Sequence, residues 1–274
     1  MTDASGHRLD HALALARGAL EHAPAGLLTD LDGTLAPIVS DPFAARPLPG
    51  AVDALLELGE RLAVAGVVTG RAALDARRML GSDQLLVIGN HGVEWLEPGR
   101  SVAALRADLA DWAPGAVHAV LGALRLGDDV WVEDKVLSAT LHFRNAPDPE
   151  ATRARLRSAL DGVSDLGARG LVVRPGRMSL EIRPAAAGDK GSALEALISR
   201  YALRGVVVLG DDVTDVDMFR VAAEARAGGR LEAAIFAVAG AGEVPPAVAA
   251  AADLVLPDPA SAAELLSSLA AASG

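Results

Sequence analysis

The sequence predicts an α/β fold, a doubly wound Rossmann-like core with a smaller α+β domain inserted into it. Short apolar runs that end at Gly or Asp alternate with Ala-rich segments of helical period, which is the pattern of a parallel sheet with crossover helices. This alternation stops in the middle third, where strand-like runs follow one another. The 274 residues are enough for a large domain and a small one.

The outer thirds supply the elements of the expected core. The expected strands are Gly26 to Thr29, Val64 to Thr69, Leu85 to Gly89, Gly205 to Leu209, Ala233 to Ala237 and Asp253 to Leu256. The expected helices are Ala51 to Ala63, Arg71 to Leu80, Lys190 to Tyr201, Asp215 to Ala225 and Ser261 to Ala272. Residues 1–101 and 185–274 therefore form one discontinuous domain.

The inserted domain is expected over residues 102–184. One long strand is expected over Val130 to Asn145, and a hairpin is expected from Leu171 to Arg174 and Arg177 to Arg183 about a Pro175-Gly176 turn. Helices near Val102 to Leu126 and Pro149 to Leu160 flank these strands. The combination indicates a small α+β unit.

Composition excludes several classes of protein. A net charge of −11 opposes binding to nucleic acid, and the absence of Cys excludes disulfides and thiolate metal sites. No apolar stretch is long enough to span a membrane, and the N-terminal segment, which carries early acids and His in place of a basic segment before an apolar one, is unlike a signal peptide. We expect a cytoplasmic protein with no membrane, nucleic-acid or obligate protein partner.

The motif DLDGTL, which begins at Asp30, comes directly after an apolar run. Two acids spaced i and i+2 at the end of a strand lie at the edge where open α/β sheets bind ligands. Taken alone, Asp-x-Asp-Gly is also typical of an ordinary turn. The motif marks a candidate active site if further polar residues end the neighbouring strands.

Further polar residues do follow the other strands. Thr69 ends a strand where a hydroxyl and helix N–H groups can hold a phosphate, and Lys190 opens a later helix. Asp211, Asp212 and Asp215 follow another strand, and carboxylates so close together suit a hard cation such as Mg²⁺. Helix capping by Thr69 or Asp215 and a solvated Lys190 are the alternatives.

The order Asp-x-Asp-Gly-Thr, Thr, Lys and Gly-Asp-Asp resembles the haloacid dehalogenase (HAD) superfamily of Mg²⁺-dependent phosphatases. The segments VEDKVLSATLHFRN, GRMSLEIRP with GDKG, and GNHGVE are similar to trehalose-6-phosphate phosphatases, over residues 25–260. There are two departures. Val216 replaces the usual Glu, with an acid one position on at Asp217, and Leu31 stands where an aromatic is common.

The resemblance implies roles for the core residues. Asp30 is the nucleophile, Asp32 is the general acid and base, and Thr69 and Lys190 contact the phosphate oxygens. The Mg²⁺ ligands are Asp30, the main-chain carbonyl of Asp32, and Asp211. Asp212 belongs to the same metal site. Asp212 and Asp215 tune the metal or orient Lys190.

The resemblance also implies that the inserted domain is a cap that sets substrate specificity. Glu133, Lys135 and Glu181 are the expected sugar-binding residues, although a solvated sheet face is the alternative. Further expected substrate contacts are Gly70, Arg71, His91 and Glu94. His142 and Arg144 are placed on the other face of their strand as structural residues.

The implied substrate is a small sugar phosphate, and the implied reaction is the hydrolysis of trehalose 6-phosphate. One alternative is a phosphatase of another phosphorylated disaccharide or pseudo-disaccharide, as in aminocyclitol antibiotic pathways. A catalytically dead sugar-phosphate sensor is the other alternative. The intact set of Asp30, Asp32, Thr69, Lys190 and Asp211 opposes it.

Overall fold

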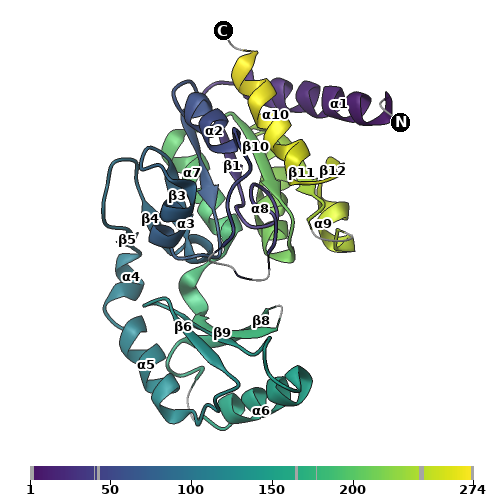
Figure 1. Ribbon diagram of the computed structural model, residues 1–274. Coiled ribbons are helices and arrows are strands. Elements are labelled where there is room, and N and C mark those ends of the chain that lie inside the picture. Colours follow the sequence, from purple (N-terminus) through teal and green to yellow (C-terminus); the bar gives the residue numbers. More distant parts are fainter. Residues whose placement is uncertain are drawn as a thin grey trace. The chain divides into compact units, whose positions relative to one another are not determined.

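The computed structural model describes residues 3–39, 41, 44–163, 166–176, 178–240 and 244–272. The chain divides into two compact units (Figure 1): unit 1 is Met1–Ala104 with Gly188–Gly274, and unit 2 is Leu105–Ala187. The sequence pattern predicts these boundaries after residues 101 and 184. The division shows that unit 2 interrupts unit 1 in the sequence.

Unit 1 is built on an eight-stranded sheet in the order β12-β11-β10-β1-β2-β3-β4-β5. Its strands are β1 (Ala25–Thr29), β2 (Val64–Val68), β3 (Leu86–Gly89), β4 (Glu94–Leu96), β5 (Ala104–Leu105), β10 (Gly205–Gly210), β11 (Glu232–Val238) and β12 (Leu254–Leu256). The strands from β12 to β3 are parallel, and β4 runs antiparallel to β3. The doubly wound α/β class is confirmed, with β1 in the middle of the parallel part.

Helices cover both faces of this sheet. They are α1 (Asp3–Leu20), α2 (Ala51–Gly59), α3 (Ala73–Leu80), α7 (Lys190–Tyr201), α8 (Val216–Ala227), α9 (Pro246–Ala251) and α10 (Pro259–Ala271), with short 3₁₀ turns η1 (Asn90–Gly92) and η3 (Val213–Asp215). Leu27 lies in the core beneath α1, α2, α3 and α10, whereas its neighbour Leu28 lies in the core beneath α7, α8 and α9. Burial on both faces is why these strands are continuous apolar runs rather than alternating ones.

The core elements differ from expectation mainly at their ends. The helix expected to reach Ala63 ends at Gly59, and the helix expected from Arg71 begins at Ala73. The region before unit 2 holds the unexpected strands β4 and β5. Helix ends are the least constrained part of a sequence pattern, because the apolar face fixes a helix's existence better than its limits.

Unit 2 is a four-stranded antiparallel sheet packed on two helices. Its elements are α4 (Ala107–Ala110), α5 (Ala113–Ala123), β6 (Trp131–Asp134), β7 (Ala139–His142), α6 (Pro149–Asp161), β8 (Leu171–Gly176), β9 (Ser179–Pro184) and η2 (Ala185–Ala187), with strand order β6-β7-β9-β8. Leu141, Leu180 and Ile182 from one sheet face pack with Val117 of α5 and Leu156 of α6. The opposite sheet face carries the polar side chains.

Two expectations for unit 2 are wrong. The run Val130 to Asn145 is not one strand but the hairpin of β6 and β7, with its turn between Asp134 and Ala139. Pro175 and Gly176 are not a turn, because they pair within β8 and β9, and Met178 has the left-handed φ of 57°. Arg177, the expected start of the second strand, lies outside the described residues.

No helix in the described parts of the chain is both long and apolar enough to cross a bilayer.

The close packing of strands in unit 1 predicts the effect of a substitution at Gly66. A Cβ added at Gly66 in β2 would lie 2.5 Å from the main-chain oxygen of Leu86. Gly66→Ala should therefore lower the free energy of unfolding by about 1 to 3 kcal/mol, measured by urea denaturation. The matched control is Gly18→Ala in α1, where nothing lies within 4 Å. This control substitution should raise the free energy of unfolding by roughly 0.5 to 1 kcal/mol. Equal changes in the free energy of unfolding for the two variants would contradict the close packing of β2 on β3.

Candidate active site

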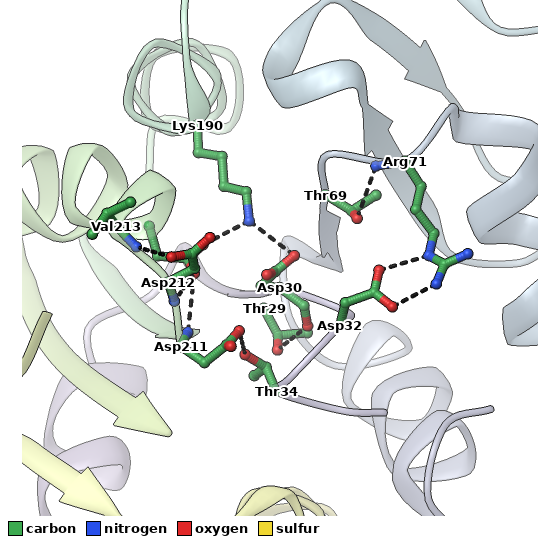
Figure 2. Close-up of polar contacts among 11 residues, drawn as sticks. Thr29, Asp30, Asp32, Thr34, Thr69, Arg71, Lys190, Asp211, Asp212 and Val213 are labelled. Atoms are coloured by element: carbon green, nitrogen blue, oxygen red, sulfur yellow. Dashed lines mark hydrogen bonds and ion pairs between the residues drawn. The ribbon is translucent and has the colours of Figure 1, made fainter. Parts of the chain in front are cut away.

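The candidate site lies where three neighbouring parallel strands end. Asp30 follows β1, Thr69 follows β2 and Asp211 follows β10, and β1 pairs with both of the other strands. The Asp30 N–H still donates to the Leu209 carbonyl, at 2.9 Å, so the sheet holds the backbone up to this residue. The three side chains are brought together at the carboxyl edge, the usual ligand site of such sheets (Figure 2).

Lys190 is the buried cation of this site. Its ammonium lies 2.8 Å from Asp30 Oδ1 and 2.7 Å from Asp215 Oδ1, and its side chain is 1% exposed. Burial lowers the pKa of Lys190, but the carboxylates of Asp215 and Asp30 outweigh burial and hold that pKa above its ordinary value. The solvated alternative for Lys190 is wrong.

The three carboxyl groups of Asp30, Asp211 and Asp215 form one acidic group, with one oxygen from each within 4.8 Å of the others. Burial raises the pKa of Asp30 well above its usual range, Lys190 opposes this, and the two other acids add to it. Burial and the Asp215 charge raise the pKa of Asp211 to about 7. Like charges held this close are stabilised by a divalent cation, so these oxygens fit Mg²⁺.

Asp30 Oδ1 is buried, and its close neighbour within the described residues is the Lys190 ammonium, at 2.8 Å. The Thr29 hydroxyl donates to the Asp30 carbonyl oxygen at 2.8 Å and so leaves the carboxylate alone. A carboxylate has about four lone-pair sites on its two oxygens, so the contact with one ammonium leaves others available for a cation or an electrophile.

Asp211 is positioned by the turn after β1. The Thr34 hydroxyl donates to Asp211 Oδ1 at 3.2 Å. Gly33 has a φ of 83°, and a Cβ there would lie 2.0 Å from Asp211 Oδ2. The Gly of the Asp-x-Asp-Gly motif is therefore required twice, by its backbone conformation and by the contact with Asp211.

Asp215 and Asp212 have different surroundings. Asp215 Oδ2 accepts hydrogen bonds at 3.0 Å from the N–H groups of both Asp211 and Asp212, so Asp215 links the lysine to the β10 turn. The Asp212 carboxylate is exposed, accepts from the Val213 N–H at 2.7 Å and lies outside the acidic group. Its assignment as a metal ligand stays a prediction. Val216 packs against the apolar core.

Asp32 is held by Arg71 rather than by the acidic group. Arg71 Nε and one terminal nitrogen donate to the two Asp32 oxygens, both at 2.6 Å, and the Arg71 N–H donates to the Thr69 hydroxyl at 3.2 Å. A bidentate guanidinium pair fixes the plane of the carboxylate as well as its charge. Arg71, expected only as a substrate contact, therefore also positions Asp32.

The segment after β3 supports the Thr69 turn. The His91 N–H donates to the Thr69 carbonyl at 3.0 Å, and a Cβ at Gly70 would lie 2.7 Å from the His91 ring. Glu94 is 7% exposed and accepts from the Ala73 N–H and the Asn90 side chain, both at 2.6 Å. These bonds indicate a positioning role for Glu94, and Asn90 is a supporting residue that sequence reasoning missed.

The three expected sugar-binding residues lie close together in unit 2. The register pairs Glu133 with Thr140 and Thr140 with Glu181, which puts both carboxylates on the polar sheet face. Lys135 lies in the β6–β7 turn, with its ammonium 3.9 Å from Glu133 Oε2. Arg183 lies 3.9 Å from Glu181 Oε2, and the Ser138 hydroxyl donates to Glu181 Oε1 at 3.2 Å. This face can offer both hydrogen-bond donors and acceptors to a polyhydroxylated ligand.

His142 is not on the opposite face, contrary to expectation. Its Nε2 lies 2.9 Å from Glu133 Oε2, and its ring stacks on Trp131. Counting alternate residues along one continuous strand gave the wrong face because the chain turns at Asp134. The Asp134 carboxylate, which accepts from the Val136 N–H, is the turn signal that could have shown this.

The fold and the site together define the class. A doubly wound core with Asp-x-Asp after β1, a hydroxyl after β2, a buried lysine at the start of α7 and acids after β10 is the HAD-like phosphatase fold. The trehalose-phosphatase family model matches residues 28–252.

Curated relatives agree with this match. The chain is 36% identical over 201 residues to a trehalose-phosphate phosphatase of Mycolicibacterium paratuberculosis, which covers 69% of this chain and 49% of that protein. The same identity relates it to an uncharacterized glycosyl hydrolase of Mycobacterium tuberculosis, over 15% of that protein. The chain thus spans about half the length of the curated trehalose-phosphate phosphatases that it matches, and less of the longer relative.

Solved structures share the fold. The C-terminal domain of C. albicans trehalose-6-phosphate phosphatase has a TM-score of 0.73 at 22% identity, with 96% of both chains covered. The Aspergillus fumigatus trehalose-6-phosphate phosphatase has a TM-score of 0.64 at 26% identity, with 97% of this chain and 98% of that chain covered. The chain belongs to the trehalose-phosphatase family.

The acidic group predicts a stability effect of magnesium. Because a cation bound only by the folded state stabilises that state, saturation at a hundred times Kd should add about 2.7 kcal/mol. We expect Mg²⁺ to raise the Tm of EDTA-treated protein, and Asp211→Ala to lose most of that rise. Asp10→Ala, at an exposed position in α1, is the control and should keep it. An equal rise in the Asp211 variant would show that the cation binds elsewhere.

Proposed function

We propose that this chain is an Mg²⁺-dependent phosphatase that hydrolyses trehalose 6-phosphate to trehalose and phosphate through an aspartyl-phosphate. One observation carries the proposal. Asp30 lies at the end of β1 with its buried carboxylate against Lys190, beside two further acids and two residues from Asp32. An attacking carboxylate, an acid–base carboxylate and a charge-neutralising lysine are what a two-step phosphoryl transfer needs.

In the first step, a carboxylate oxygen of Asp30 attacks phosphorus as the bond from phosphorus to the sugar oxygen breaks. Asp32 gives its proton to that departing oxygen, so trehalose leaves as a neutral alcohol. Arg71 fixes the Asp32 carboxylate through both oxygens. This pair has to loosen for Asp32 to reach the departing oxygen, because the Arg71 guanidinium occupies both oxygens of the carboxylate.

In the second step, Asp32 removes a proton from a water that attacks phosphorus and breaks the bond to Asp30. Phosphate leaves, and Asp30 and Asp32 return to their starting protonation states. Thr69 and Lys190 contact the phosphoryl oxygens and stabilise the charge that they carry. The Asp30 and Asp211 carboxylates and the Asp32 carbonyl oxygen would hold Mg²⁺, which supplies further neutralisation of the phosphoryl charge when bound.

We assign substrate selection to unit 2 as a cap, a domain that the sequence pattern predicts over residues 102–184. Glu133, Lys135 and Glu181 supply charged hydrogen-bonding groups on one sheet face, which suits a sugar rich in hydroxyls. The names of the relatives support a disaccharide phosphate as the substrate. A cytoplasmic location is part of the same proposal.

The test of this function is phosphate release from a panel of sugar phosphates with Mg²⁺ and with EDTA. Trehalose 6-phosphate should be preferred over glucose 6-phosphate and over other disaccharide phosphates, and EDTA should abolish turnover. Preference for another disaccharide phosphate would favour the alternative substrate class. Binding without any turnover would favour the sensor.

Asp30→Asn should remove the activity, because an amide is a poor nucleophile of nearly the same shape. We expect a loss of at least about a thousandfold in kcat for trehalose 6-phosphate. The control is Asp10→Asn, which should act as the parent. A folded Asp30→Asn protein with activity near that of the parent would remove Asp30 from its role.

Asp32→Asn should affect substrates according to their leaving groups. General acid catalysis contributes about 10² to 10⁴ in rate and matters most for a poor leaving group such as a sugar alkoxide. The loss in kcat/KM for trehalose 6-phosphate should exceed the loss for p-nitrophenyl phosphate by about tenfold or more. Equal losses on both substrates would mean that Asp32 is not the acid.

A further inference from the structure

We infer that Trp131 and His142 form, together with Glu133, a sugar-stacking subsite on the polar sheet face of unit 2. In this subsite the Trp131 indole packs on the apolar face of a pyranose ring, and His142 positions Glu133 for the hydroxyls of that ring. The inference rests on the proposed function, since it assigns new residues to the recognition of the same substrate.

The strand register puts these residues on one face. Trp131 pairs with His142 across β6 and β7, and His142 pairs with Ser179 across β7 and β9. Directly paired residues in an antiparallel sheet point to the same side, as do residues two apart. Trp131, Glu133 and His142 therefore share the face of Glu181, opposite the side packed on α5 and α6.

Trp131 contacts His142, and His142 in turn contacts Glu133. The ring centroids of Trp131 and His142 lie 4.7 Å apart with an interplanar angle of 26°, and His142 Nε2 lies 2.9 Å from Glu133 Oε2. With Nε2 protonated, the imidazole donates to this oxygen, which fixes both the ring plane and the carboxylate. The imidazole thus supports the indole on one side and holds an acceptor beside it.

The exposure of Trp131 separates it from the packing residues of unit 2. Its side chain is 51% exposed on the edge strand β6 and is not part of the apolar cluster beneath the sheet. In a chain with only 3% aromatic residues, this half-exposed indole is an apolar surface on the same sheet face as the Glu133 carboxylate. A pyranose has the matching chemistry, because its ring carries apolar C–H faces and a rim of hydroxyls.

Trp112 is a matched control in the same unit. It lies next to α5, its indole N–H donates to the Asp108 carbonyl at 2.8 Å, and a Cβ at Gly170 would lie 3.0 Å from its ring. These contacts join α4 to the loop before β8 and lie outside the sheet face. Trp112 is also partly exposed, at 36%, so the two residues are comparable in type and exposure.

The experiment compares Trp131→Ala and Trp131→Leu with Trp112→Ala on trehalose 6-phosphate and on p-nitrophenyl phosphate. Both Trp131 variants should lose about 5- to 20-fold in kcat/KM for trehalose 6-phosphate, chiefly through KM. Hydrolysis of p-nitrophenyl phosphate should stay within about twofold, as should both activities of Trp112→Ala. Two Trp131 variants with the parent's KM for trehalose 6-phosphate, or parallel losses on both substrates, would overturn the subsite.

His142 is tested as a positioning residue through rescue. His142→Ala should raise the KM for trehalose 6-phosphate about tenfold, and His142→Gln, whose amide can still donate to Glu133, should recover to within about threefold. Equal defects in these two variants would show that the hydrogen bond to Glu133 has no such role.

Calorimetry with free disaccharides separates this inference from the proposed function. Absence of trehalose 6-phosphate turnover in the parent would overturn the proposed function alone. The subsite is judged by the Kd for trehalose, maltose and sucrose. Binding by the parent that weakens at least about fivefold in both Trp131 variants supports it, and no binding, or equal binding by parent and variants, overturns it.

Discussion

The buried ammonium of Lys190 is the contact on which the rest of the active site depends. Three carboxyl groups meet at the end of the central sheet, and burial raises the pKa of two of them, Asp30 and Asp211. Lys190 contacts Asp30 and Asp215 at 2.8 and 2.7 Å, and its positive charge opposes the rise in the pKa of Asp30 that burial causes. The Asp189 side chain fixes Lys190 at the first turn of α7 through a capping box with Ser192.

Much of this site could be predicted from the sequence, because the backbone leaves few choices there. The strands before Asp30 and Asp211 are buried on both faces and are uninterrupted apolar runs in the sequence. The residue at which each strand ends can therefore be predicted from the sequence. Gly33 marks a turn that also admits Asp211. The ion pair between Arg71 and Asp32 could not be predicted, since it joins two loops whose approach depends on sheet order and on the orientation of two long side chains.

In unit 2 the sequence signals were weaker, and the reason is local. The β6–β7 turn contains no Gly, Pro or Asn. Instead Val136 takes a φ of 68°, which is unfavourable for a β-branched residue, and the Asp134 carboxylate accepts from its N–H at 2.9 Å. Because side chains alternate with a period of two, one missed turn assigned His142 to the wrong face. The Pro175-Gly176 pair predicted a turn at the wrong place, because the residue with the left-handed turn conformation is Met178.

Substitutions in the two units differ in their cost in folding free energy. In unit 1, Asp215 accepts from two main-chain N–H groups and from Lys190, so one substitution there would disturb the lysine and the turn that carries Asp211 together. On the polar face of unit 2, Glu133 and His142 are partly exposed, and water can replace a lost partner at small cost. Substitutions on this polar face are therefore cheaper in folding free energy than substitutions around Lys190. Under the proposed function, a constant reaction with a variable sugar is the expected outcome of this division.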